Sequence, residues 1–279
     1  MIHLILDSCC DLNDEMRAEL KPDRAALKVI VEGREDVDDG TVDIPDLIRR
    51  MKASRRAASS ACPSVEEYAE LMRPHDEVFV VTLSAKLSGS YNAAYAAQML
   101  VLEESPEKKI HVFDSKAAVS GETLLALYLH EQIGRGLSFE EIVPLGEAKV
   151  KNTHTLFVLE DLGNMIKNGR LSKIPGLLAS ILSICPILSD DGNGEVKMLA
   201  KVRGIQNSLQ RLCEITAEMI GKTRSSITLV LAHCNCPERA EKVREMLRTL
   251  CPKLGEIHMI ATGALSTIYA NEGGIVLAF

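Results

Sequence analysis

Short apolar runs alternate with helical segments along the first half of this chain, and this alternation constrains the fold more than any other feature. Residues 78–82 form a short, almost entirely apolar run, which is typical of a strand buried on both faces of a parallel sheet. The alanine-rich residues 91–102 contain no helix breaker and favour a helix. Repetition of this unit predicts a mostly parallel sheet with helices on both faces.

The pattern of the second half is different, and it changes near Thr153. The segment Asp190-Asp191-Gly192-Asn193-Gly194 is a turn signal that predicts a hairpin between two strands. We therefore expect two α/β domains, residues 1–152 with the parallel sheet and residues 153–279 with a mixed sheet and helices. The expected strands lie at 2–6, 26–31, 78–82, 110–113, 156–159, 226–232, 257–260 and 273–279, and the expected helices at 11–20, 44–52, 64–72, 91–102, 121–133, 139–151, 203–220 and 237–250.

Composition excludes several classes of protein. A hydrophobic content of 46% with 25% charged residues is typical of a soluble globular protein. The net charge of −7 lacks the basic footprint that binding to nucleic acid requires. Residues 1–7 have no basic segment and reach a carboxylate at Asp7, so we expect a first strand there and not a signal peptide. This, with eight cysteines, favours a cytoplasmic protein with reduced thiols.

Metal and cofactor motifs are missing from the sequence. The adjacent Cys9 and Cys10, and the Cys234-Asn235-Cys236 segment, do not have the paired spacing of zinc sites. Neither the P-loop pattern nor the dinucleotide-binding glycine pattern occurs. We therefore expect no metal site and no cofactor.

Hydroxyl-rich loops follow the expected strands, and one of them begins a helix. In a parallel sheet the carboxyl ends of the strands meet at one edge, where ligands bind. Within residues 87–91, Ser88 and Ser90 lie beside a helix start whose free N–H groups suit an anion, although a serine there is also an ordinary N-cap. The clusters that we expect at this edge are Asp7-Ser8, residues 59–64, residues 84–90 and Asp114-Ser115.

Three further features leave alternatives open. Ser88 lacks the G-x-S-x-G context, but catalytic triads are spatial, so a serine hydrolase acting on a small ester stays open. Arg170, after the Asn168-Gly169 turn, either binds a carboxylate or phosphate or lies at the surface. The apolar residues 174–188 are either a buried core helix or the wall of a lipid tunnel.

Taken in order, six motifs of this chain resemble those of the DegV family of bacterial fatty-acid-binding proteins. The resemblance covers the whole chain, and the order of the motifs makes it specific. The matching segments are Leu6-Asp7-Ser8 with Asp11-Leu12, Ser60-Ala61-Cys62-Pro63-Ser64, residues 84–91, Asp114-Ser115-Lys116, residues 159–171 and Ile184-Cys185-Pro186-Ile187-Leu188.

The resemblance implies that one long-chain fatty acid is buried between the two domains and is not turned over. Its carboxylate would bind the hydroxyls of Ser60 and Ser88, with Arg170 near the head group. The resemblance also implies that a separate fatty acid kinase receives the bound acid, and we expect transient contact with a membrane surface. The other residues expected at the ligand are Ala61, Gly89, Ser90, Ser115 and Ile184.

Two departures from the family pattern bear on these expectations. The first loop keeps Ser60 but has Ala61 and Cys62 where the family has other polar residues. The family's carboxy-terminal H-t-G-P-G motif is replaced by residues 270–274, so Ala270 stands where the family has histidine. Loss of the histidine affects partnership with a kinase more than it affects binding of the acid. A lipid-responsive interaction module is a further alternative.

Overall fold

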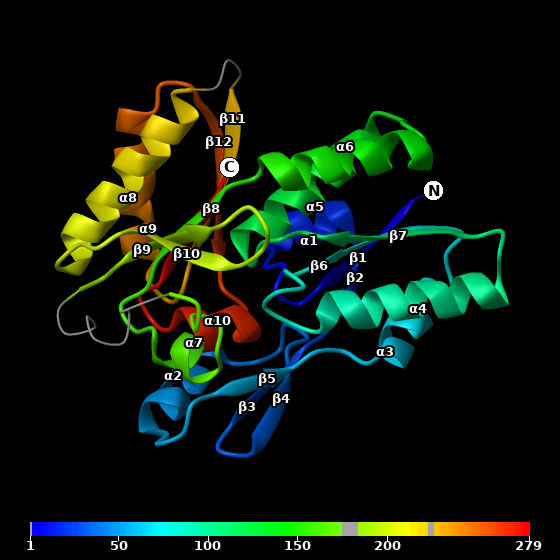
Figure 1. Cartoon of the computed structure of the whole chain (residues 1–279), viewed down its shortest axis with the longest axis horizontal. Helices are drawn as coiled ribbons and strands as arrows, with labels where there is room; N and C mark the ends of the chain where they lie inside the picture. Colours follow the sequence, from blue (N-terminus) through cyan, green and yellow to red (C-terminus); the bar gives the residue numbers. More distant parts are fainter. Residues whose placement is uncertain (1, 175–183, 223–225) are drawn as a thin grey trace.

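The computed structural model describes residues 2–174, 184–222 and 226–279, and its framework consists of three β-sheets (Figure 1). The first sheet has the strand order β2-β1-β6-β7, and all its neighbouring strands are parallel. This confirms the parallel sheet expected from the alternating pattern. Its strands are β1 (His3–Asp7), β2 (Asp23–Ala25), β6 (Glu77–Thr82) and β7 (Lys109–Asp114).

Helices bury both faces of this sheet, as the uninterrupted apolar strands require. Side chains of β1 and β6 alternate, so that Ile5 and Val80 face α3 and α4 whereas Leu6 and Phe79 face α5 and α6. The helices are α1 (Asp14–Leu20), α3 (Val65–Met72), α4 (Ser90–Glu104), α5 (Ser120–Gly134) and α6 (Phe139–Asn152).

The strand expected at residues 26–31 is present at residues 28–31, but it belongs to a small antiparallel sheet and not to the parallel sheet in which it was expected. The chain leaves the parallel sheet after Ala25 and starts β3 (Lys28–Val31), which pairs with β4 (Arg34–Val37) and β5 (Ser59–Ala61). Glu32 and Gly33 both have positive φ and form the tight turn that returns the chain. Helix α2 (Ile44–Ala53) joins β4 to β5.

The second domain contains a mixed six-stranded sheet in the order β10-β9-β8-β13-β11-β12. Among these strands β11 and β12 are parallel, and the other neighbours are antiparallel, including the predicted hairpin between β9 and β10. The elements are β8 (Thr155–Val158), β9 (Ile187–Asp190), β10 (Val196–Ala200), α8 (Ile205–Ile220), β11 (Ile227–His233), α9 (Pro237–Leu250), β12 (Leu254–Ala261) and β13 (Ile275–Ala278).

One face of the mixed sheet packs against α8 and α9, and the other face shares a core with the first domain. Phe157 and Val276 belong to that shared core together with Phe79 and Leu125 of the first domain. Each sheet takes its strands from one side of residue 152. We therefore propose the end of α6 as the domain boundary.

Two short helices of the second domain were not expected from the sequence. They are α7 (Gly163–Lys167) and α10 (Ala264–Ala270), and both are too short to show helical periodicity. The helix considered at 174–188 is wrong at its carboxyl end, where Ile187 starts β9, and residues 175–183 lie outside the described part. No helix in the described ranges is long and apolar enough to cross a bilayer.

The amino terminus of α10 is held by two buried carboxylates from the first domain. Asp38 accepts hydrogen bonds from the N–H groups of Ala264 and Leu265, at 3.2 and 3.0 Å, and pairs with Arg24 at 3.1 Å. Asp11 accepts from the N–H of Gly263 at 2.8 Å. These bonds satisfy N–H groups that the helix cannot satisfy itself, and they join the domains.

We expect Asp38→Ala to lower the free energy of unfolding by about 2 to 4 kcal/mol, because it removes a buried cap and leaves Arg24 without its partner. Urea denaturation measures this change. The control Asp39→Ala removes an exposed carboxylate one residue further on and should cost less than about 1 kcal/mol. Equal effects of the two variants would show that the cap does not hold the domains together.

Candidate functional site

A cavity lies at the carboxyl edge of the parallel sheet, between the two domains. Its empty volume is about 880 Å³, including space open to solvent. The loop after β1 contributes Cys9, the loop after β6 contributes Leu83, Leu87 and Ser88, the loop after β7 contributes residues 116–119, and β5 contributes Ser60. The loops expected to meet at this edge therefore do meet there.

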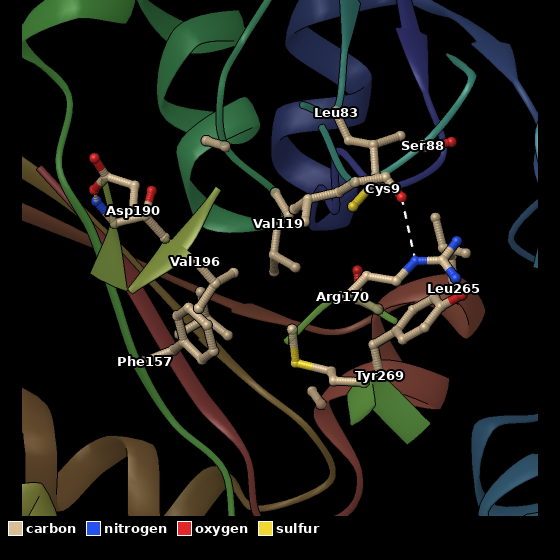
Figure 2. A pocket seen from close by; sticks show the side chains of 18 of the residues that line it. Cys9, Leu83, Ser88, Val119, Phe157, Arg170, Asp190, Val196, Leu265 and Tyr269 are labelled. Carbon is tan, nitrogen blue, oxygen red and sulfur yellow. Dashed lines mark hydrogen bonds between the residues drawn. The ribbon is translucent and has the colours of Figure 1, made fainter. Parts of the chain in front are cut away.

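The second domain supplies the opposite wall, which is predominantly apolar. Phe157 of β8 and Val276 of β13 line it from the mixed sheet, and Met165 of α7 and Leu265 of α10 line it from the two short helices. Figure 2 shows Phe157 and Leu265. The described part of the chain thus encloses an apolar volume between two sheets. Such a wall suits a hydrocarbon ligand, because burial of apolar surface is the main source of its affinity.

Three hydroxyl groups and a guanidinium group gather at one end of this cavity. The hydroxyl oxygens of Ser60 and Tyr269 lie 2.8 Å apart, and the guanidinium carbon of Arg170 lies 5.4 Å from the centre of the Tyr269 ring. Figure 2 shows Ser88, Arg170 and Tyr269 on the same side of the cavity. Ser60, Ser88 and Arg170, which the sequence motifs singled out, therefore line one cavity together.

Arg170 is fixed by backbone groups and keeps its charge available. Its Nε donates to the carbonyl of Leu87 at 3.2 Å, and its Nη1 donates to the carbonyl of Asn168 at 2.6 Å. Carbonyl oxygens orient the guanidinium without neutralising it. In the described ranges Arg170 forms no ion pair with a carboxylate, so an anionic ligand would be its first charged partner.

Ser88 can act both as a cap at the start of a helix and as a hydrogen-bond donor to an anion. The Oγ of Ser88 accepts a hydrogen bond from the N–H of Ser90 at 3.2 Å, as a serine at a helix start does. That bond uses the oxygen as an acceptor and leaves the O–H free to donate. The hydrogen bonds of Ser88 in the described structure involve Ser84 and Ser90, and no histidine is placed to activate it as a nucleophile.

Buried Asp7 positions this loop from behind. Its Oδ2 accepts from the N–H of Leu83 at 2.9 Å and from the hydroxyl of Ser90 at 2.8 Å, and Ser90 also bonds to the Tyr68 hydroxyl at 2.6 Å. Burial raises the pKa of Asp7, against the lowering effect of these hydrogen bonds. The Ser90 hydroxyl is thus hydrogen-bonded to Asp7 and Tyr68 behind the cavity wall.

The remaining predicted ligand residues do not belong to the lining of the cavity. Ala61 is exposed at the end of β5, and Gly89 is the exposed N-cap of α4. The buried Ser115 hydroxyl bonds within its own turn, to the backbone of Ala117. Ile184 forms an isolated bridge with Arg203 and is half-buried.

Tyr269 is the site residue that sequence reasoning missed. Attention to the family's histidine position led to Ala270, whereas the polar side chain that reaches Ser60 comes from the preceding residue. The only signal in the sequence was a tyrosine adjacent to that position in a chain with five tyrosines. Its direction depends on how α10 is turned, which the sequence did not reveal.

Comparisons with known proteins agree with this architecture. The model of a family described as uncharacterised proteins of the DegV family matches residues 1–279. The chain belongs to the DegV family. A DegV domain-containing protein of Streptococcus pneumoniae is 32% identical over 278 residues, covering 99% of this chain and 98% of the relative, and one from Streptococcus pyogenes is 34% identical with the same coverage.

Three similar structures of the DegV fold contain fatty acids. A DegV protein of Ruminococcus gnavus, refined with vaccenic acid, has a TM-score of 0.94 and 36% identity. The Streptococcus pneumoniae Fatty Acid Kinase (Fak) B3 protein, loaded with linoleic acid, has a TM-score of 0.90 and 32% identity. A DegV family protein of Eubacterium eligens, loaded with heptadecanoic acid, has a TM-score of 0.90 and 28% identity. Each comparison covers 100% of this chain and 99% of the other.

The cap of α10 in this DegV protein has an unusual carboxyl group. Burial and, secondarily, repulsion from Asp38 raise the pKa of Asp11 to about 7, although the hydrogen bond from the Gly263 N–H opposes the rise. Ser266 lines the cavity, so Asp11 lies directly behind its wall. The stability that Asp11 contributes is fully present below its unfolded pKa of about 4 and is lost as the pH rises through about 7.

We expect Asp11→Asn to abolish this pH dependence while retaining an acceptor for the Gly263 N–H. The free energy of unfolding of the wild type, minus that of the variant, should fall by a few kcal/mol between pH 4.5 and pH 8. Urea denaturation across this range measures the difference. Parallel curves for the two proteins would show that Asp11 titrates normally in the folded state.

Proposed function

We propose that this protein binds one long-chain fatty acid and does not turn it over. The observation that carries the proposal is a mostly apolar cavity with Ser60, Ser88, Arg170 and Tyr269 at one end. A fatty acid has the matching polarity, with a hydrocarbon chain and a single anionic head. The fatty acids in three relatives of 28% to 36% identity support the same ligand class.

The free energies of transfer are compatible with tight binding. Burying an acyl chain of roughly fifteen methylenes at about 0.8 kcal/mol each contributes on the order of 12 kcal/mol before the costs of association. The carboxylate is expensive to desolvate unless it is hydrogen-bonded or paired. The Ser88 hydroxyl and the Arg170 guanidinium have donors available for it.

The distribution of charge favours one orientation of the acid. Asp190 lies with Phe157 and Val196 on the side of the cavity away from Arg170 (Figure 2). The Asp190 carboxylate accepts from the N–H groups of Thr155 and Gly192, at 2.8 and 3.0 Å. Glu195 and Lys116 also line the cavity, so the two carboxylates outnumber the single ammonium group. A further carboxylate there would be repelled, and we place the head group beside Arg170 and the methyl end toward Phe157.

We further propose that the protein presents its acid to a fatty acid kinase in the cytoplasm. The similarity to the Fak B3 protein over the whole chain supports this partner class. The family's histidine is absent, but the Tyr269 hydroxyl reaches the same end of the cavity from the residue next to Ala270. Nothing in the described residues supports the expected contact with a membrane surface.

Mass spectrometry of ligand released from the purified protein tests the proposal directly. We expect a long-chain fatty acid in stoichiometric amount, and uptake of fatty acid by the delipidated protein. Reproducible absence of both would overturn the proposal. Labelling of Ser88 by a fluorophosphonate, together with turnover of acyl esters, would instead favour a serine hydrolase.

We expect the double variant Ser60→Ala and Ser88→Ala to bind a fatty acid roughly 10- to 100-fold more weakly, because it loses hydroxyl groups next to the carboxylate. The methyl ester of the same acid should lose far less affinity, since it carries no charge. Titration of delipidated protein with both ligands measures this. The control Ser105→Ala lies outside the cavity lining. Equal weakening for acid and ester would contradict recognition of the head group by these hydroxyls.

Tyr269→Phe separates the hydroxyl from the ring. The variant keeps an aromatic face under Arg170 and loses the group that lies 2.8 Å from the Ser60 oxygen. We expect about a 10-fold loss of fatty acid affinity with an unchanged melting temperature. Tyr95→Phe, at a tyrosine that is 49% exposed, is the matched control. Unchanged affinity in Tyr269→Phe would remove Tyr269 from the head-group site.

A further inference from the structure

Two histidine side chains converge on one aspartate oxygen at the other edge of the parallel sheet. The Nε2 atoms of His3 and His75 lie 2.9 and 3.0 Å from the same Oδ2 atom of Asp23. The two imidazole rings are stacked, with their centroids 3.8 Å apart and an angle of 15° between their planes. The three potential ligand atoms all lie within 4.8 Å of one another.

The backbone holds these residues on three neighbouring segments. His3 is the first residue of β1, Asp23 is the first residue of β2, and His75 stands just before β6. Since the strands are parallel, this is the amino edge of the sheet, whereas the cavity lies at the carboxyl edge. Figure 1 accordingly shows the amino-terminal end far from α10, which carries Tyr269. The cluster is therefore separate from the proposed fatty acid site.

From this geometry we propose that His3, Asp23 and His75 bind a divalent transition-metal ion of the Zn²⁺ class. Two imidazole nitrogens and one carboxylate oxygen are a donor set that Zn²⁺ accepts, with a fourth position left for water. When the metal binds, each ring carries its proton on Nδ1, so that the Nε2 lone pair faces the ion.

Access and surrounding charge are compatible with an ion from solution. The side chains of both histidines are 26% exposed and that of Asp23 is 42% exposed, so solvent reaches the cluster. Lys108 donates to the carbonyl of His75 at 2.8 Å and holds that residue in place. Its positive charge is opposed by Asp76 at 4.0 Å. A bound ion would link β1, β2 and the start of β6, and would stabilise the folded state.

Calorimetric titration of the chelator-treated, full-length protein with Zn²⁺ alone tests the site. We expect one equivalent to bind and the melting temperature to rise with Zn²⁺. His3→Ala and Asp23→Asn should each weaken binding at least 10-fold, and so should His75→Gln, which keeps a hydrogen-bonding side chain beside Asp23. Co²⁺ should give the absorption bands of a tetrahedral site in the wild type and lose them in these variants.

Two control variants locate the metal. His111→Ala removes a histidine that pairs with Glu147 elsewhere on the surface, and Cys62→Ser removes an exposed thiol. Both should bind Zn²⁺ as the wild type does. The proposal is overturned if the wild type shows no saturable binding, if binding survives the loss of both histidines, or if Cys62→Ser abolishes it. Fatty acid affinity, measured on the same variants, should be unchanged.

Discussion

The capping of α10 by Asp11 and Asp38 is the interaction on which the rest of the site depends. A helix of seven residues has little stability of its own, because its nucleation cost is spread over few hydrogen bonds. Carboxylates from the first domain satisfy its first N–H groups and fix its position against β3 and α2. Helix α10 in turn presents Leu265 and Tyr269 to the cavity.

The cavity combines predominantly apolar walls with a cluster of hydrogen-bond donors at one end. Strands of the two sheets supply the apolar walls, and loops at the strand ends supply the donors. Arg170 is oriented by backbone carbonyl oxygens, which carry no net charge and leave the charge of the guanidinium unpaired. The Tyr269 hydroxyl, 2.8 Å from the Ser60 oxygen, adds a further polar group at this end.

Elements with a strong local pattern were predictable. The apolar run before α4 and the Asp-Gly-rich turn between β9 and β10 specify a buried strand and a hairpin through short-range physics. The sheet to which residues 28–31 belong was not predictable, because β2 and β3 follow one another closely in the chain although they belong to different sheets. Helices α7 and α10 were not predicted, because segments of five and seven residues are too short to show the periodicity of a helix. Their stability comes from tertiary contacts.

By itself the sequence determined the α/β class, the family, and Ser60, Ser88 and Arg170 as head-group candidates, because these rest on short patterns and on their order along the chain. Tertiary structure decided which hydroxyls face the cavity. It turned Ser90 toward Asp7 and brought Tyr269 to Ser60, 209 residues away in the chain. It also brought together His3, Asp23 and His75, whose separations of 20 and 52 residues follow no motif. Such contacts depend on how strands and helices pack against one another, and local spacing does not encode that packing.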